Sequence, residues 1–151
     1  MKIELNKTYS FEVDNFSFGG LENEELIELF KDGRVASFFL EPQLTKWFPE
    51  LTHVKGCKDH DHIDESGNKY DAKNFTKNGL KFMPSNQIGA GRGFDYETTR
   101  KKIEETGMTY IACDINNFPT VNVKFVNGIE LLEKYPTATI TLKDKELFFK
   151  L

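Results

Sequence analysis

The chain has 151 residues, a formal net charge of −4 and a hydrophobic content of 38% that includes fourteen Phe, so it can bury one proper core. We expect a single domain over residues 1–151. No apolar run approaches the roughly 18 residues of a membrane span and the first residues carry no apolar signal region, which predicts a soluble, cytoplasmic protein without a membrane partner. Two Cys without a secretion signal favour reduced thiols and exclude a disulfide framework.

The first third of the sequence predicts strands and two helices. Residues 3–18 mix aromatic, β-branched and polar side chains as one or two edge strands would, and Asn23 is a typical N-cap for a helix that ends at Phe30. Residues 33–48 predict a second helix, which Pro42 is expected to bend or restart. Its expected apolar face consists of Val35, Phe38, Phe39, Leu44, Trp47 and Phe48. On a continuous helix, one polar stripe would hold Arg34, Ser37 and Glu41.

The remaining sequence alternates strands with helices. Residues 51–55 predict a first strand, and residues 57–76 predict a tight hairpin because the ESGN at its middle is turn chemistry. A glycine-rich loop over residues 77–94 follows, and loops of that length are uncommon unless they are functional. The elements expected after it are a helix from Asp95 to Thr106, strands over residues 109–114 and 121–126, a short helix over residues 127–135 and one more strand in the tail.

The second strand of the hairpin carries charges that suggest chemistry. Asp71 and Lys73 are two residues apart, so they project from one face of a strand at roughly 6.8 Å along the chain. Asp61 lies about level with Asp71 across the hairpin. Two facing carboxylates repel each other unless a cation lies between them, and oxygen ligands favour Mg²⁺. A shift of one residue in the hairpin register would bring Asp64 to that face instead of Asp61.

This pattern resembles that of the PD-(D/E)XK nucleases, in which an acid is followed, after a variable gap, by Asp or Glu, any residue and Lys on the second strand of a hairpin. Here the pattern reads Asp61, nine residues, then Asp71-Ala72-Lys73. The predicted order of helix, three strands, helix and two strands is similar to that family's αβββαβ core. The resemblance implies an α/β fold with a restriction-endonuclease-like core over about residues 33–126, a mixed central sheet flanked by helices, and N- and C-terminal decorations.

The resemblance also implies an activity and the residues that carry it. The activity is Mg²⁺-dependent hydrolysis of DNA phosphodiester bonds by a restriction-type endonuclease, in which Mn²⁺ can substitute for Mg²⁺. Asp61, Asp71 and the Ala72 carbonyl would hold the metal. Glu41 would reach it directly or through water, because family members offer a Glu from the first core helix. Lys73 would orient the attacking water and stabilise charge at the phosphate.

A basic segment follows the acidic hairpin. Between Lys73 and Lys102 there are seven basic and two acidic residues, a local net charge of +5 in a chain whose total is −4. This distribution is typical of a protein that contacts a nucleic-acid backbone, which makes DNA the expected partner. Whether the protein forms a homodimer stays open in the sequence. A solvated charged loop is the alternative. The expected DNA contacts are Lys77, Asn78, Lys81, Asn86, Gln87 and Arg92.

Two other interpretations of the hairpin stay open. The same stretch holds donors softer than those Mg²⁺ prefers, and these could bind Zn²⁺ instead. The four donors are His53, Cys57, His60 and His62. The hairpin could also be a plain surface element of a non-catalytic module that binds protein or DNA. A metal screen separates the three interpretations, because they predict Mg²⁺-dependent cleavage, tight zinc retention and neither of these, respectively.

Overall fold

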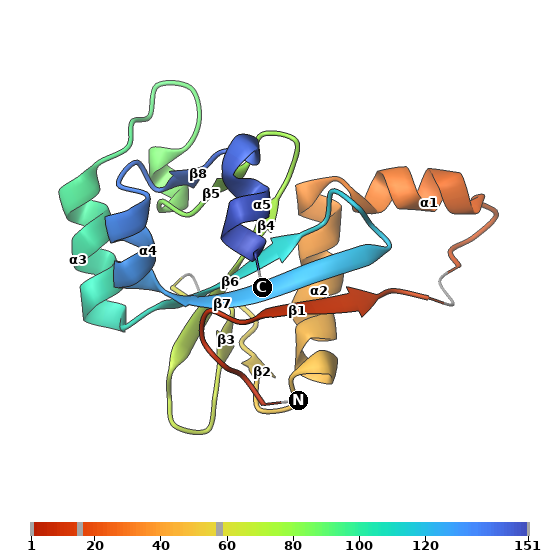
Figure 1. Ribbon diagram of the computed structural model, residues 1–151, viewed down its shortest axis with the longest axis horizontal. Coiled ribbons are helices and arrows are strands. Elements are labelled where there is room, and N and C mark those ends of the chain that lie inside the picture. Colours follow the sequence, from red (N-terminus) through yellow and green to blue (C-terminus); the bar gives the residue numbers. More distant parts are fainter. Residues whose placement is uncertain (1, 15–16, 57–58, 151) are drawn as a thin grey trace.

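The structure is a computed structural model that describes residues 2–14, 17–56 and 59–150. Its centre is a six-stranded sheet (Figure 1). In spatial order the strands are β1 (Thr8–Glu12), β7 (Thr120–Asn127), β6 (Thr109–Asp114), β4 (Lys69–Phe75), β3 (His62–Ile63) and β2 (Thr52–His53). Strands β4 and β6 are parallel, and the other neighbouring pairs are antiparallel. The expected α/β class with a mixed sheet is confirmed.

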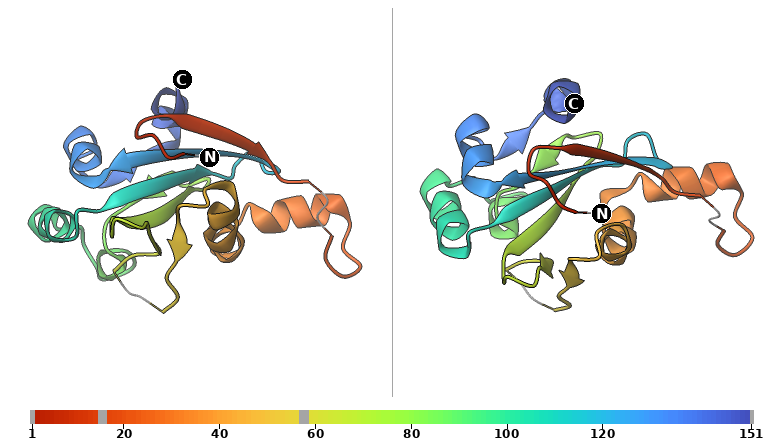
Figure 2. Two further views of the ribbon diagram at one scale, coloured as in Figure 1. Left: turned by 90° about the horizontal axis from the view of Figure 1, so that it is seen from below. Right: turned by 60° about the horizontal axis from the view of Figure 1, so that its bottom comes forward.

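Helices flank this sheet on both faces (Figure 2). They are α1 (Asn23–Phe30), α2 (Gly33–Trp47), α3 (Tyr96–Thr106), α4 (Gly128–Lys134) and α5 (Lys145–Phe149). Helices α1 and α2 lie at one end and α3 and α4 at the other, and Figure 2 shows the same separation from two further directions. The expected caps are present at α3, which stops at the left-handed Gly107, and at α4, whose first N–H groups bond to the Asn127 side chain.

Two hydrophobic cores share the central strands. On β6, Tyr110 and Ala112 belong to the core that includes residues of α3, α4 and α5. Ile111 and Cys113 belong to the core that includes residues of α2. Alternate residues of a strand face opposite sides, so β6 serves both cores and its sequence is apolar without alternation.

The two N-terminal helices differ from expectation in their details. Helix α1 begins after Glu22, whose N–H donates to Glu25 at 3.1 Å, so Asn23 is the first helical residue and not the N-cap. Helix α2 continues through Pro42 and does not restart there. The predicted polar stripe of this helix is therefore formed on one continuous element.

The apolar face of α2 also needs correction. Its buried residues are Ala36, Leu40 and Leu44, which pack into the core beneath this helix. Phe38, which was expected in that face, is 82% exposed. Helical geometry explains the exchange, because Phe38 lies on nearly the opposite side of the helix from Leu40.

The segment over residues 77–94 is more ordered than the expected loop. It contains β5 (Leu80–Lys81) and a 3₁₀ helix, η1 (Ser85–Gln87). Strand β5 pairs with β8 (Thr139–Ile140) in a small second sheet. Gly79 makes this pairing possible, because its φ of 83° is left-handed and a Cβ there would clash with the carbonyl oxygen of Ile140.

The terminal segments pair with the sheet and pack into its cores. Strand β1 pairs with β7, and its Tyr9 is buried in the core beneath α2. Helix α5 contributes Phe148 and Phe149 to the other core, and its Lys145 forms an ion pair of 3.1 Å with the buried Asp114. Within the described ranges, no helix combines the length and apolar character that a membrane span needs.

Candidate functional site

The hairpin of β3 and β4 aligns the two expected acids. His62 pairs with Tyr70 and Ile63 with Lys69, and the same register carried one position further sets Asp61 level with Asp71. Five residues, 64–68, connect the strands, and the left-handed Gly67, with φ of 82°, lies in the turn. The predicted hairpin is confirmed. Just beyond the paired residues, the Asp61 N–H donates to the Tyr70 carbonyl at 2.9 Å, and the side chain of Asp61 lies next to that of Asp71.

Asp61, Asp71 and Lys73 form a compact charged cluster. Asp71 Oδ2 lies 3.0 Å from Lys73 Nζ, and the Ala72 N–H donates to Asp61 Oδ2 at 2.9 Å. The pKa of Asp61 is raised to about 7, mainly by burial and then by the negative charge and hydrogen bond of Asp71, against the lowering effect of the Ala72 N–H. Near neutral pH Asp61 is therefore partly protonated, and it would release this proton on binding a cation.

Helix α2 brings a third acid to this cluster. Glu41 has its Oε2 at 3.1 Å from His53 Nε2, and its charge contributes to the raised pKa of Asp61. His62 Nε2 donates to the Glu41 carbonyl at 2.7 Å, which ties the helix backbone to β3. Burial lowers the pKa of His62, so this ring is neutral and structural. The sequence placed both histidines in a candidate zinc site and gave no signal that they position Glu41.

The cluster lines a cavity of about 310 Å³ between α2, β4 and α3. Ser37 and Glu41 come from α2, and the segment that joins β5 to η1 supplies a further wall. The α3 wall carries the half-buried Lys102 together with Thr99 and Thr106. Lys102 was one of the seven basic residues counted in the sequence. Its position opposite the acids depends on how α3 packs.

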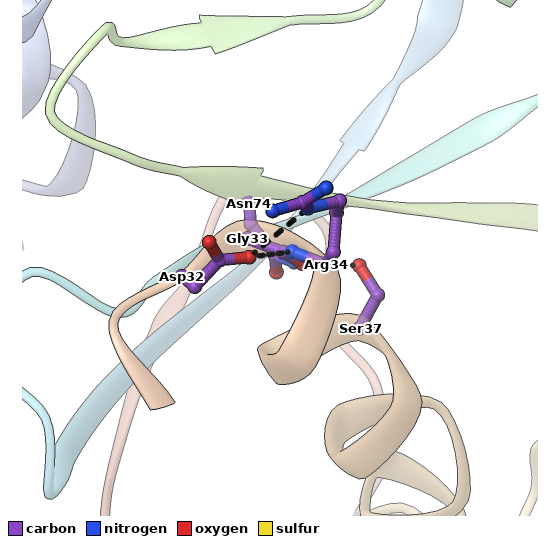
Figure 3. A network of polar contacts seen from close by, with 5 residues as sticks. All are labelled: Asp32, Gly33, Arg34, Ser37 and Asn74. Atoms are coloured by element: carbon purple, nitrogen blue, oxygen red, sulfur yellow. Dashed lines mark hydrogen bonds and ion pairs between the residues drawn. The ribbon is translucent and has the colours of Figure 1, made fainter. Parts of the chain in front are cut away.

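A polar network locks α2 against the end of β4 (Figure 3). Asn74 Nδ2 donates to Ser37 Oγ at 2.9 Å and to the Gly33 carbonyl at 3.2 Å. A Cβ on Gly33 would come within 2.9 Å of the Thr76 side chain, so glycine allows this close approach. Asn74 was not singled out in the sequence, yet it helps to set the position of the helix that carries Glu41.

These donors fit Mg²⁺ better than a softer metal. The N–H and C=O of one strand residue point to the same side, so the Ala72 carbonyl faces the same space as the N–H that reaches Asp61. Two carboxylates and one carbonyl are hard oxygen donors, and Mg²⁺ is commonly held by one or two carboxylates with water completing its shell. Among the described residues, no group of three or more His, Cys, Asp and Glu side chains could hold a metal ion by itself.

Several expected site residues have other roles. Asp64, the rival of Asp61, accepts hydrogen bonds from the Ser66 and Asn68 N–H groups and from the Tyr70 hydroxyl, so it stabilises the turn. Gln87 is 9% exposed, and its Oε1 accepts from the Asp95 N–H and the Thr99 hydroxyl. Gln87 was expected to contact DNA, but its side chain is buried and joins η1 to the start of α3.

The other expected DNA contacts lie on the surface in two groups. Lys77 and Asn78 line a groove of about 860 Å³ that also includes Lys31 and Arg34. Lys81 and Asn86 are exposed and flank the segment that lines the acidic cavity. Arg92 Nη1 instead approaches carbonyl oxygens of its own loop, Ser85 at 3.4 Å and Ile88 at 3.5 Å. Of the four expected zinc ligands, His53 and His62 are engaged with Glu41, and Cys57 lies outside the described residues.

Comparisons with family models, curated proteins and solved structures find no match to this chain.

Proposed function

We propose that this protein is a Mg²⁺-dependent deoxyribonuclease whose reaction takes place in the cavity between α2, β4 and α3. The observation that carries this proposal is the close pair Asp61 and Asp71 beside Lys73, in which burial and the second carboxylate raise the pKa of Asp61 to about 7. A solvated surface hairpin would not hold its acids in this way. A strongly shifted acid with a specific charged partner in a cavity is a typical sign of a functional site.

The order of elements supports a finer description of the fold. Helix α2, the strands β2, β3 and β4, helix α3 and strand β6 follow one another as helix, three strands, helix and strand, apart from the short insertion of β5 and η1. This is the order expected for a restriction-endonuclease-like core, and we propose that assignment for the α/β sheet. DNA as the partner belongs to the same proposal, and a homodimer and a cytoplasmic location stay predictions.

Each residue of the cavity has a role in the proposed reaction. Asp61, Asp71 and the Ala72 carbonyl would hold Mg²⁺, which supplies Lewis-acid activation of water and neutralises charge at the phosphate. Lys73 donates hydrogen bonds to the attacking water and to a phosphate oxygen as negative charge develops there. Glu41, fixed by His53, accepts a hydrogen bond from water in the cavity.

The test is cleavage of supercoiled plasmid by the full chain with Mg²⁺, with Mn²⁺ and with EDTA. We expect nicked or linear DNA with either metal and intact plasmid with EDTA. Asp71→Asn should be inactive, because it removes a metal ligand. Asp64→Asn is the matched control from the same hairpin and should keep its activity, because Asp64 serves the turn.

Two results would contradict the proposal. The first is a folded wild-type protein that leaves plasmid, linear and single-stranded DNA intact with both metals. The second is an Asp71→Asn protein that cuts as fast as the parent. Zinc retained through chelation, together with inactive wild-type protein, would instead favour a zinc site on the histidines.

A further inference from the structure

One side of α2 joins the acidic cavity to solvent. Arg34, Ser37, Phe38 and Glu41 follow the spacing i, i+3, i+4 and i+7, so on this continuous helix they form one stripe. Ser37 and Glu41 line the cavity. Phe38 is 82% exposed, and the side chain of Arg34 is 90% exposed. The stripe therefore presents an aromatic ring and a guanidinium directly beside the acids.

The side chain of Phe38 does not belong to the core beneath α2. The core beneath α2 is filled from the other side by Ala36, Leu40 and Leu44. A single exposed apolar side chain is by itself ordinary. The position of this ring, between the exposed Arg34 and a polar cavity, makes it informative. Pro42 has no N–H, so the Phe38 carbonyl also lacks its usual α-helical donor and offers an acceptor beside the ring.

Beyond Arg34 the stripe continues into a groove of about 860 Å³ that carries charges of both signs. Its basic residues are Lys31, Arg34 and Lys77, and its acidic residues are Glu28 and Asp32. Arg34 Nε lies 3.5 Å from Asp32. An exposed ion pair of this length is weak, so the guanidinium of Arg34 stays available for another anion. Figure 3 shows Arg34 on the first turn of α2, next to Ser37 and the end of β4. The acidic cavity, the Phe38 ring and the groove therefore follow one another along α2.

This sequence of features matches the parts of a single nucleic-acid strand. The groove has one more basic than acidic side chain, and its exposed Arg34 and Lys77 can bind phosphates. A nucleobase stacks on an aromatic ring whatever its identity. A base within a duplex has both faces covered by its neighbours, so a ring on a helix surface reaches only an unpaired base. Phe38 can therefore distinguish single-stranded from double-stranded DNA without any sequence-specific contact.

We propose that Phe38 is a stacking platform for an unpaired base next to the scissile phosphate, and that Arg34 binds a neighbouring phosphate. The substrate class is then DNA with a single-stranded segment, such as a single strand, a flap or a frayed end. This inference rests on the proposed nuclease function, whose cavity supplies the cleavage site.

Binding in EDTA tests the inference separately from cleavage. The probes are fluorescent oligothymidine and a duplex of matched length, and the readout is anisotropy. We expect wild-type protein to bind the single strand more tightly than the duplex. Phe38→Ala should bind the single strand about tenfold more weakly, because stacking on one base is lost, and should bind the duplex unchanged. Phe38→Trp should restore the preference, and Arg34→Gln should reduce the salt slope of log K by about 0.7.

The control is Leu147→Ala on α5, which removes a side chain of similar exposure (65%) outside the proposed track. It should bind both probes as the parent does. Equal binding of the two probes by wild-type protein, or unchanged single-strand binding by Phe38→Ala, would overturn the inference. So would a Phe38→Ala protein that turns from dimer to monomer in light scattering while its DNA binding stays unchanged, because the ring would then be a protein contact. If no DNA is cut but the binding differences appear, the nuclease proposal fails and the strand-binding role of Phe38 stands.

Discussion

Two Asp–Lys ion pairs, one within β4 and one between the neighbouring parallel strand β6 and helix α5, have almost the same N–O distance and very different surroundings. Asp71 and Lys73 are 3.0 Å apart, and Asp114 and Lys145 are 3.1 Å apart. The side chains of the second pair are 4% and 14% exposed, against 19% and 27% for the first. The more buried pair is thus the one that joins α5 to the sheet.

The difference lies in what surrounds each aspartate. The second oxygen of Asp114 accepts the Asn116 N–H at 2.9 Å, so one acid and one base form a satisfied pair. At Asp71 a second acid, Asp61, is held against the first, and the charge of Glu41 also acts on Asp61. A close ion pair therefore does not identify a site by itself. The excess of buried negative charge over the single lysine is what predicts a cation.

The largest expected effect is on activity. Lys73→Ala should lower Mg²⁺-dependent plasmid cleavage by about a hundredfold to a thousandfold, because a donor to the developing phosphate charge is lost. Lys145→Ala, assayed at a temperature where it is folded, should cut at nearly the parental rate. Equal losses in the two variants would show that both lysines act through stability alone.

The second effect is on stability, and here Lys145→Ala should have the larger effect of the two variants. Lys145→Ala should lower the free energy of unfolding by about 3 kcal/mol, because it leaves the buried Asp114 without its counter-charge. Lys73→Ala should cost less, since its pair is more exposed and the neighbouring acids can take up a proton. Urea unfolding of both variants in EDTA measures the difference. A larger loss in Lys73→Ala would reverse the comparison.

The third effect is a pH dependence that belongs to the acid pair. The folded protein keeps the Asp61 proton up to about pH 7, whereas the unfolded chain loses it near the ordinary value of 3.8, so metal-free stability falls as pH rises between these values. Relative to Asp61→Asn, the wild-type protein should lose about 2–3 kcal/mol between about pH 4 and pH 8. His62, whose pKa is lowered by burial, gives the opposite trend in both proteins and cancels in the difference. Parallel stability curves for the two proteins would remove the basis for a cation site.

The smallest effect is the stabilisation by metal itself. Mg²⁺ at about ten times its dissociation constant should add about 1.4 kcal/mol to the stability of the wild-type protein. Asp61→Asn and Asp71→Asn should lose this gain, whereas Asp64→Asn should keep it. Melting temperatures with and without MgCl₂ give the answer. A gain that persists in Asp71→Asn would place the bound metal elsewhere.

The sequence by itself determined the elements that depend on local chemistry. The turn around Gly67 and the period of two in a strand fixed the hairpin register, and with it the level placement of Asp61 and Asp71. Capping residues likewise predicted the end of α3 at Gly107 and the start of α4 at Asn127. These features need only a few neighbouring residues, which is why a pattern can report them.

Only the tertiary structure decided which side chains are buried and which meet. It buried Gln87 beneath α3 and exposed Phe38 on α2, although the sequence suggested the reverse for each. It also brought His53 to Glu41 and Asn74 to Ser37 across long stretches of chain. The raised pKa of Asp61 has the same origin, because burial and a neighbouring charge come from the packing of distant elements and leave no mark on local sequence.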